Sequence, residues 1–241
     1  MERVESEYPE VCNGVEEPPP DPKQLKRWPE IGYILPFAVF IGFLAVDKYL
    51  PVPQAVRFLS VLALLAVFSR GILPSRPSRF FSSVLLGVAV FFIWIGPDAL
   101  IPGYRTSILF SNSLVGHPEG ATVPTDKINF VFLVFRVLGS VITIPIIEEL
   151  FWRGWMMRWI ANHHFDRIPV GTWHKEAFWI VALLFASEHG SYWDVGLITG
   201  AIYNWWAIRT KNLTDCVIAH AVTNACLAIY VIGWGKWQYW L

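Results

Sequence analysis

The stretch Ile128–Gly154 reads INFVFLVFRVLGSVITIPIIEELFWRG and predicts a membrane-spanning helix that ends in charged residues. Its first part, Ile128–Ile147, is an almost unbroken apolar run of the length that crosses a bilayer as a helix, which takes about 20 residues. Glu148 and Glu149 follow at the end of the run, with Arg153 four residues after Glu149. Because ionisable side chains at membrane depth are costly, an adjacent pair of carboxylates there predicts a functional site.

The composition of the whole chain agrees with a membrane protein. The 241 residues are 54% hydrophobic with a mean hydropathy of +0.44, and charged residues make up only 16%. A soluble domain holds roughly 25% charged residues. The apolar runs are continuous, whereas a membrane β-barrel needs alternating apolar and polar residues. We therefore expect an all-α, polytopic transmembrane helical bundle. The net charge is zero and no basic stripe is present, so no nucleic-acid partner is predicted.

The apolar segments predict about seven spans. They are Ile31–Tyr49, Val52–Phe68, Phe80–Ile95, Ile128–Ile147, Ala177–Ser187, Val195–Ile208 and Val217–Ile232. The fifth and sixth are shorter than a full crossing, so they either extend into their flanks or form a shallow hairpin inside the bundle. An eighth span is conceivable at Ala99–Phe110, but the proline and glycine content there favours a loop.

The chain divides into two regions. Residues 1–29 are acidic and rich in proline, which predicts a disordered tail, and residues 30–241 form the transmembrane helical domain. Lysine and arginine gather at alternate ends of the spans, which predicts a cytoplasmic N-terminus in a multi-pass protein of the lipid bilayer. The cations on the predicted cytoplasmic side are Lys23, Lys26, Arg27, Arg70, Arg76, Arg79, Arg153, Arg158, Arg167, Lys175, Arg209 and Lys211. The opposite side holds Lys48, Arg57, Arg105, Lys127 and Lys236.

Two later apolar segments carry the polar groups that a carboxylate pair needs for chemistry. His189 follows Phe185 by four residues, and His220 precedes Asn224 by four. Glu148 and His189 are equidistant from a turn signal at residues 168–169, so an antiparallel hairpin places them at one depth. His220 lies about ten residues beyond the next turn, which is about 15 Å along a helix. We expect the three patches to meet in one polar cavity.

The helical spacing assigns different tasks to the two glutamates. Glu149 and Arg153 are neighbours at i and i+4 and are expected to pair, whereas Glu148 points about 100° away and stays available. Each patch also has an ordinary structural interpretation. The carboxylates can mark the interfacial end of a helix, His189 can be a packed or capping residue, and His220 with Asn224 can hydrogen-bond between helices.

Together the three patches resemble the CPBP family of intramembrane proteases, whose eukaryotic members are the type II CAAX prenyl endopeptidases. The pattern of that family is E-E-x-x-x-R, F-x-x-x-H and H-x-x-x-N or -D. It is intact here as Glu148-Glu149…Arg153, Phe185…His189 and His220…Asn224. The resemblance runs from about Ile128 to the end of the chain. The stretches at residues 193–196 and 235–240 also look like the CAAX-protease-related branch found beside exosortase systems in bacteria.

The resemblance implies an intramembrane endopeptidase of the bacterial inner membrane. Its substrate would be a membrane-embedded or membrane-associated protein or peptide, with a functional link to an exosortase system. Glu148, with Glu149 beside it, would activate a water molecule that His189 orients. His220 and Asn224 would donate hydrogen bonds to the oxyanion, and Arg153 would support the site. No serine or cysteine in the motifs stands beside a histidine, which disfavours an acyl-enzyme.

A metal-dependent mechanism and a metal-free mechanism are both open. Glu148, His189 and His220 match the ligand set of catalytic zinc sites that keep an open position, although no H-E-x-x-H motif is present. A metal-free glutamate mechanism uses the same residues. We slightly favour a divalent metal, zinc, which makes a metalloprotease the expected class.

Two other classes of function compete with the protease. The same fold can serve as a non-catalytic binding or immunity protein, because fold does not fix function. The glutamates and histidines can also form the relay of a proton-coupled transporter. Such transporters commonly have repeated halves, and no internal repeat is evident in this sequence.

Overall fold

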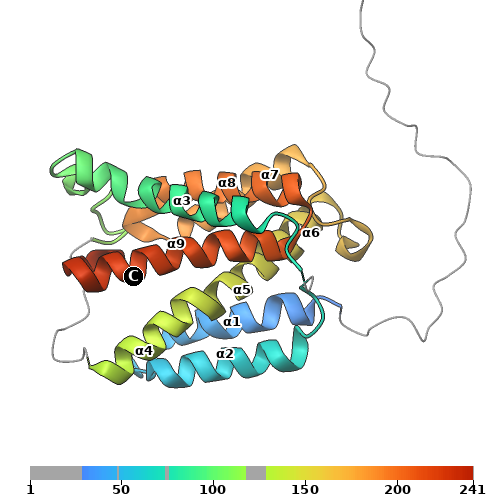
Figure 1. Cartoon of the computed structure of the whole chain (residues 1–241), viewed down its shortest axis with the longest axis horizontal. Coiled ribbons are helices and arrows are strands. Elements are labelled where there is room, and N and C mark those ends of the chain that lie inside the picture. The colour runs from blue at the N-terminus through green and yellow to red at the C-terminus, as the bar shows by residue number, and fades with distance from the viewer. Residues whose placement is uncertain (1–28, 48, 74–75, 118–128, 241) are drawn as a thin grey trace, which may run out of the picture.

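The computed structural model describes residues 29–47, 49–73, 76–117 and 129–240, which fold into helices joined by loops (Figure 1). Over these residues the only strand-like pairing is an isolated bridge between Asn112 and Gly116. The main helices are α1 (Ile31–Val46), α2 (Gln54–Phe68), α3 (Phe80–Leu100), α4 (Phe130–Leu138), α5 (Ile144–Glu149), α6 (Met157–Ala161), α7 (Lys175–Ser187), α8 (Trp193–Thr210) and α9 (Leu213–Trp234).

Each apolar segment recognised in the sequence coincides with a helix, which confirms the all-α class. The stretch considered for an eighth span is different. Beyond Leu100 it contains only the short 3₁₀ turn Tyr104–Thr106, so the loop interpretation is confirmed as far as residue 117. The predicted disordered tail lies outside the described residues, apart from its last residue.

The outer surface of the helices suits a lipid environment. Three helices in the described ranges are long and apolar enough to cross a membrane: α3, the continuous helix Phe130–Ala161, and α9. Helices α1 and α2 are apolar but shorter. Large apolar side chains on these helices point outward, including Phe81, which is 81% exposed, and Phe130, which is 79% exposed. The chain is therefore a membrane helical bundle, and the number of seven spans stays a prediction.

The helices form two groups on either side of the long helix (Figure 1). One hydrophobic cluster fills the space between α3, α8 and α9, and a second joins α1, α2, α7 and the long helix. Helices α3 and α9 approach closely at Gly87, where an added Cβ atom would lie 2.4 Å from the carbonyl oxygen of Ala219. Small residues at such crossings let membrane helices pack backbone to backbone.

The long helix is interrupted twice by π-helical turns. One spans Gly139–Thr143 and the other spans Leu150–Met156, so α5 lies between them with Glu148 and Glu149 at its end. Pro145 lacks an N–H group, which removes one α-helical hydrogen bond next to the first π turn. Turns of this kind occur frequently at functional sites because they re-aim the side chains that follow.

The exposed positive charges are divided between the two ends of the bundle more unevenly than the sequence alone indicates. Arg153 and Arg158 are buried inside the bundle, and so are Arg57 and Arg105 on the opposite side. Arg57 pairs with Asp47, and Arg105 pairs with two aspartates. The described cations that remain exposed lie mostly at the right-hand end of Figure 1, where α2 leads into α3 and α8 into α9; they are Arg70, Arg76, Arg79, Arg167, Lys175, Arg209 and Lys211, against Lys236.

Candidate active site

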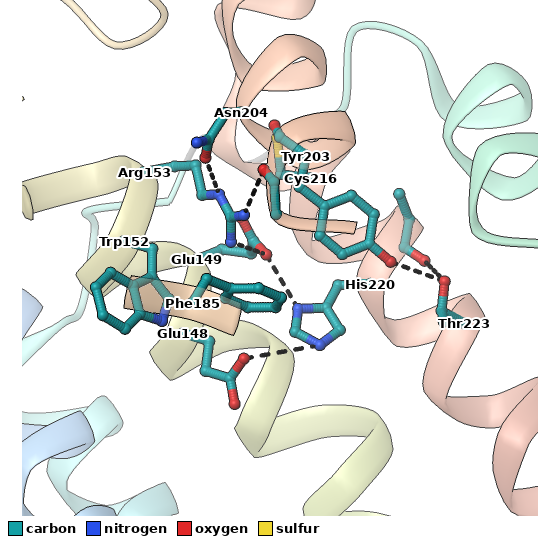
Figure 2. A network of polar contacts seen from close by, with 12 residues as sticks. Glu148, Glu149, Trp152, Arg153, Phe185, Tyr203, Asn204, Cys216, His220 and Thr223 are labelled. Carbon is teal, nitrogen blue, oxygen red and sulfur yellow. Dashed lines mark hydrogen bonds and ion pairs between the residues drawn. The ribbon is translucent and has the colours of Figure 1, made fainter. Parts of the chain in front are cut away.

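A fully buried ion pair lies at the centre of the site (Figure 2). Arg153 Nη1 donates to Glu149 Oε1 at 3.1 Å, and neither side chain is exposed. Arg153 Nε donates to Asn204 Oδ1 at 2.9 Å, and Nη2 donates to the carbonyl oxygen of Gly200 at 3.2 Å. The ion pair predicted from the i, i+4 spacing is therefore confirmed. Asn204, on α8, holds the guanidinium in place.

His220 is hydrogen-bonded to this ion pair. Its Nδ1 lies 3.0 Å from Glu149 Oε1, the same oxygen that Arg153 contacts (Figure 2). Because the arginine stabilises an ionised carboxylate, Glu149 is the acceptor and the imidazole Nδ1–H is the donor. The second ring nitrogen, Nε2, is thereby turned toward Glu148, whose Oε2 lies 3.9 Å away.

Glu148 faces a cavity, whereas Glu149 faces the protein interior. The cavity has a volume of about 210 Å³, and Glu148, His189, His220 and Asn224 all line it. Glu148 Oε2 is buried and has no hydrogen-bond partner among the described side chains and backbone groups. A buried carboxylate oxygen without a partner is suited to bind a group that enters the cavity, such as water.

His189 has one ring nitrogen fixed and the other free. Its Nδ1 lies 2.7 Å from the carbonyl oxygen of Phe185, one turn earlier at the end of α7. A carbonyl oxygen only accepts, so Nδ1 carries the hydrogen and Nε2 of the neutral ring carries a lone pair. The rings of Phe185 and Trp94 pack against the imidazole at centroid distances of 4.7 and 5.1 Å. His189 is thus oriented as an acceptor at the cavity.

Asn224 is held by the first π turn of the long helix. Its Nδ2 donates to the carbonyl oxygen of Ser140 at 2.8 Å. This contact fixes the orientation of the amide and leaves the second hydrogen on Nδ2 for another acceptor. His220 and Asn224, one turn apart on α9, both line the cavity, as their shared helical face predicts.

Several residues of the cavity wall are not among the site residues predicted from the sequence. Trp94 from α3 and Tyr203 from α8 line it, and so does Glu188, whose Oε2 accepts from Trp152 Nε1 at 3.2 Å. Tyr203 also contacts Thr223 through its hydroxyl at 2.8 Å (Figure 2). Aromatic residues are abundant along this chain, so no spacing distinguishes these two from aromatic residues that face lipid. The sequence indicates Glu188 only through its position next to His189.

The candidate zinc ligands have suitable donor atoms, but their side chains are not grouped closely enough. His189 and His220 each use Nδ1 in a hydrogen bond, which leaves Nε2 for a metal ion. This arrangement is common in zinc ligands. Within the described ranges, however, no group of three histidine, cysteine, aspartate or glutamate side chains lies close enough to hold a metal ion. The arrangement of Glu148, His189 and His220 therefore does not fit a three-ligand zinc site.

The geometry combines acceptors and donors around one cavity. Glu148 and His189 present acceptor atoms, and Asn224 presents a donor hydrogen. His220 Nε2 becomes a donor when the ring carries a second proton. Acceptors activate a water molecule and donors stabilise an oxyanion, which are the two requirements of hydrolysis at a carbonyl carbon.

The part of the chain that contains these residues matches a known protein family. Residues 130–226 match the model described as "Type II CAAX prenyl endopeptidase Rce1-like". The matched segment begins at the start of α4 and ends on α9 just beyond Asn224, so it includes all three motifs. Comparisons with the curated proteins and with the solved structures give no match.

Proposed function

We propose that the chain hydrolyses a peptide bond of a membrane-embedded or membrane-associated substrate, on the premise that residues 130–226 match the model of the Rce1-like type II CAAX prenyl endopeptidases. The observation that carries the proposal is the single cavity lined by Glu148, His189, His220 and Asn224. Its volume of about 210 Å³ is well above the roughly 10–15 Å³ that a cavity needs to hold one water molecule. A water molecule therefore has room there.

In the first step, Glu148 is the general base. A water molecule bound between Glu148 Oε2 and His189 Nε2 would donate a hydrogen bond to each acceptor. Its oxygen attacks the carbonyl carbon of the scissile bond as its proton moves to Glu148. The C–O bond forms, and the carbonyl π electrons move onto the oxygen.

The oxyanion that forms is stabilised by donors on α9. Asn224 uses the hydrogen on Nδ2 that Ser140 leaves free, and His220 donates from Nε2 in its doubly protonated form. Collapse of the tetrahedral intermediate breaks the C–N bond as Glu148 returns the proton to the leaving amine. Glu148 ends as the carboxylate, and the products are a new carboxyl terminus and a new amino terminus.

Glu149 and Arg153 support this chemistry from behind the cavity. Glu149 accepts from His220 Nδ1, and Arg153 fixes that carboxylate while being anchored itself by Asn204. The pair sets the position of His220 and determines which of its nitrogens faces the cavity. Locking a functional side chain through a buried network is a recurrent way to pre-organise a site.

The proposal places the protein in the inner membrane of a bacterium with the N-terminus in the cytoplasm. The described cations that are exposed gather at the end of the bundle where α1 begins, which supports this orientation. A functional link to an exosortase system stays a prediction from the resemblance of residues 193–196 and 235–240.

A divalent metal stays a separate prediction, since the described side chains do not form a three-ligand site. Metal analysis of the purified protein, with cleavage measured before and after chelation, tests this prediction. Loss of cleavage on chelation and its return with zinc would support the metal.

The proposed function can be tested in host membranes, where the natural substrate is present without having been identified. Membranes containing the wild-type protein or the Glu148→Gln variant are incubated, and new peptide termini are mapped by mass spectrometry. We expect a set of paired termini that appears only with the wild-type protein. An identical set of termini in both preparations would contradict the proposed hydrolysis.

A further inference from the structure

The loop that follows α3 folds over the segment that carries His189. Arg105, on the 3₁₀ turn Tyr104–Thr106, donates from Nη1 to the carbonyl oxygen of Ser191 at 2.7 Å. The same nitrogen lies 2.7 Å from Asp194 Oδ1 at the start of α8. Arg105 is only 6% exposed, although its loop lies at one end of the bundle. A buried arginine that binds both a backbone carbonyl and a carboxylate fixes their relative position.

Arg105 also connects this segment to α3. Its Nε lies 3.2 Å from Asp98 Oδ1 in the last turn of α3. Its guanidinium carbon lies 4.1 Å from the ring centroid of Tyr192, which is 1% exposed. Tyr239 donates from its hydroxyl to Asp98 Oδ2 at 2.8 Å. One cation thus joins the end of α3 to the start of α8.

The anchored segment begins at His189 itself. The backbone N–H of Tyr192 donates to the carbonyl oxygen of His189 at 2.8 Å, which closes the 3₁₀ turn Gly190–Tyr192. Ser191 and Tyr192 therefore lie one turn from the imidazole and directly under Arg105. A displacement of this turn moves the backbone of His189 relative to the cavity.

Two further contacts join the same turn to this loop. Gly190 has a φ of +49°, and an added Cβ atom would lie 2.9 Å from the carbonyl oxygen of Val115 in the loop. Trp193 Nε1 donates to the carbonyl oxygen of Leu109 at 3.0 Å. The loop and the turn therefore pack without space for a side chain at Gly190.

We infer that Arg105 is a positioning residue for His189, an inference that rests on the proposed function for its kinetic consequence. Arg105 holds the turn after His189 between the end of α3 and the start of α8. The clamp keeps His189 Nε2 directed at the cavity, where the attacking water is held. Arg105 itself does not line that cavity.

The kinetic test compares Arg105 with a matched buried arginine. Arg57 is also 6% exposed and pairs with Asp47, but it lies on α2 and is not part of the cavity wall. Arg105→Gln is expected to lower kcat up to about 10²-fold, the effect that a misplacement of 1 Å can have, with KM little changed. Arg105→Lys is expected to recover part of kcat, because it restores the charge but not the fork of donors. Arg57→Gln is expected to retain the wild-type kcat.

The structural test reads the orientation of His189 without any substrate. Protein labelled with ¹⁵N-histidine gives tautomer-specific ring signals, and His189→Gln identifies the signal of His189. In the wild type that signal is expected to show Nδ1 protonated. In Arg105→Gln the His189 signal is expected to shift or broaden, whereas the His220 signal is expected to stay unchanged. In Arg57→Gln both signals are expected to match those of the wild type. Gly190→Ala, which pushes the loop away from the turn, is expected to reproduce the Arg105→Gln spectrum.

The two tests separate the failure of this inference from the failure of the proposed function. If the wild-type protein cleaves nothing, the proposed function fails, but the His189 signals still decide the role of Arg105. Unchanged His189 signals in Arg105→Gln would overturn the inference, whatever Gly190→Ala shows. Equal losses of kcat in Arg105→Gln and Arg57→Gln would also overturn it, because they would reflect general destabilisation.

Discussion

At the scale of single residues, the site depends on two adjacent glutamates that have different surroundings. Glu149 is enclosed by Arg153 and His220, whereas Glu148 has an oxygen directed into the cavity. Their positions differ by one residue, which turns the side chains about 100° apart on a helix. Neighbouring positions therefore provide one carboxylate for the buried ion pair and one for the cavity wall.

The buried pair of Glu149 and Arg153 is expected to contribute to stability more than an ordinary charge. Glu149→Gln leaves Arg153 without a counter-charge in the interior, so the free energy of unfolding should fall by roughly 3–5 kcal/mol. Unfolding in mixed micelles of increasing denaturing detergent measures this loss. Glu176, on the first turn of α7 with a 68% exposed side chain, is the control. Glu176→Gln should change the stability by less than about 0.5 kcal/mol. Equal stability of the two variants would contradict this account of Glu149.

Asn224 is expected to act on turnover rather than on folding. Asn224→Ala removes one oxyanion donor, which typically lowers kcat by about 10²–10³-fold. KM should change little, because the donor acts on a charge that develops in the transition state. Steady-state kinetics on a substrate found by terminus mapping measures both constants. Cys226→Ala, two residues further on α9 and away from the cavity wall, should retain the wild-type kcat. A loss of affinity without a loss of kcat in Asn224→Ala would assign this residue to substrate binding.

At the scale of elements, the crossing of α3 and α9 holds the helix that bears His220 and Asn224. Gly87→Ala would place a Cβ atom 2.4 Å from the carbonyl oxygen of Ala219, so the two helices must separate. We expect a loss of roughly 1–3 kcal/mol in stability, the usual cost of overpacking. Gly42 on α1 is the matched control, because an added Cβ atom there meets nothing within 4 Å. Gly42→Ala should leave stability unchanged or increase it. Equal effects of the two substitutions would contradict the close packing at Gly87.

The helices could be predicted from the sequence because long apolar runs carry a strong signal. The positions of Glu149 and Arg153 were also predictable, since the i, i+4 relation is local. The π turns at Gly139–Thr143 and Leu150–Met156 were not, because a changed hydrogen-bond pattern over five to seven residues leaves no periodicity to read. The clamp by Arg105 depends on residues more than eighty positions away, which no local pattern reveals.

At the scale of the whole molecule, the distribution of exposed cations predicts a cytoplasmic N-terminus. Arg209, at the end of α8, and Lys236, just beyond α9, lie at opposite ends of the bundle. In a variant without the native cysteines, a cysteine at Arg209 should react with an impermeant thiol reagent only after the membrane is opened. A cysteine at Lys236 should react in intact spheroplasts. The reverse pattern would place the N-terminus outside the cytoplasm.

In the proposed hydrolysis, Glu148 activates the water that cleaves the substrate. The most direct measurement is single-turnover cleavage by wild-type, Glu148→Gln and Glu176→Gln proteins in vesicles, using a peptide that spans a mapped cleavage site. We expect Glu148→Gln to lower the rate by at least about 10²-fold, the lower range for a general base, and Glu176→Gln to cleave like the wild type. Cleavage by Glu148→Gln at the wild-type rate would contradict this role of Glu148.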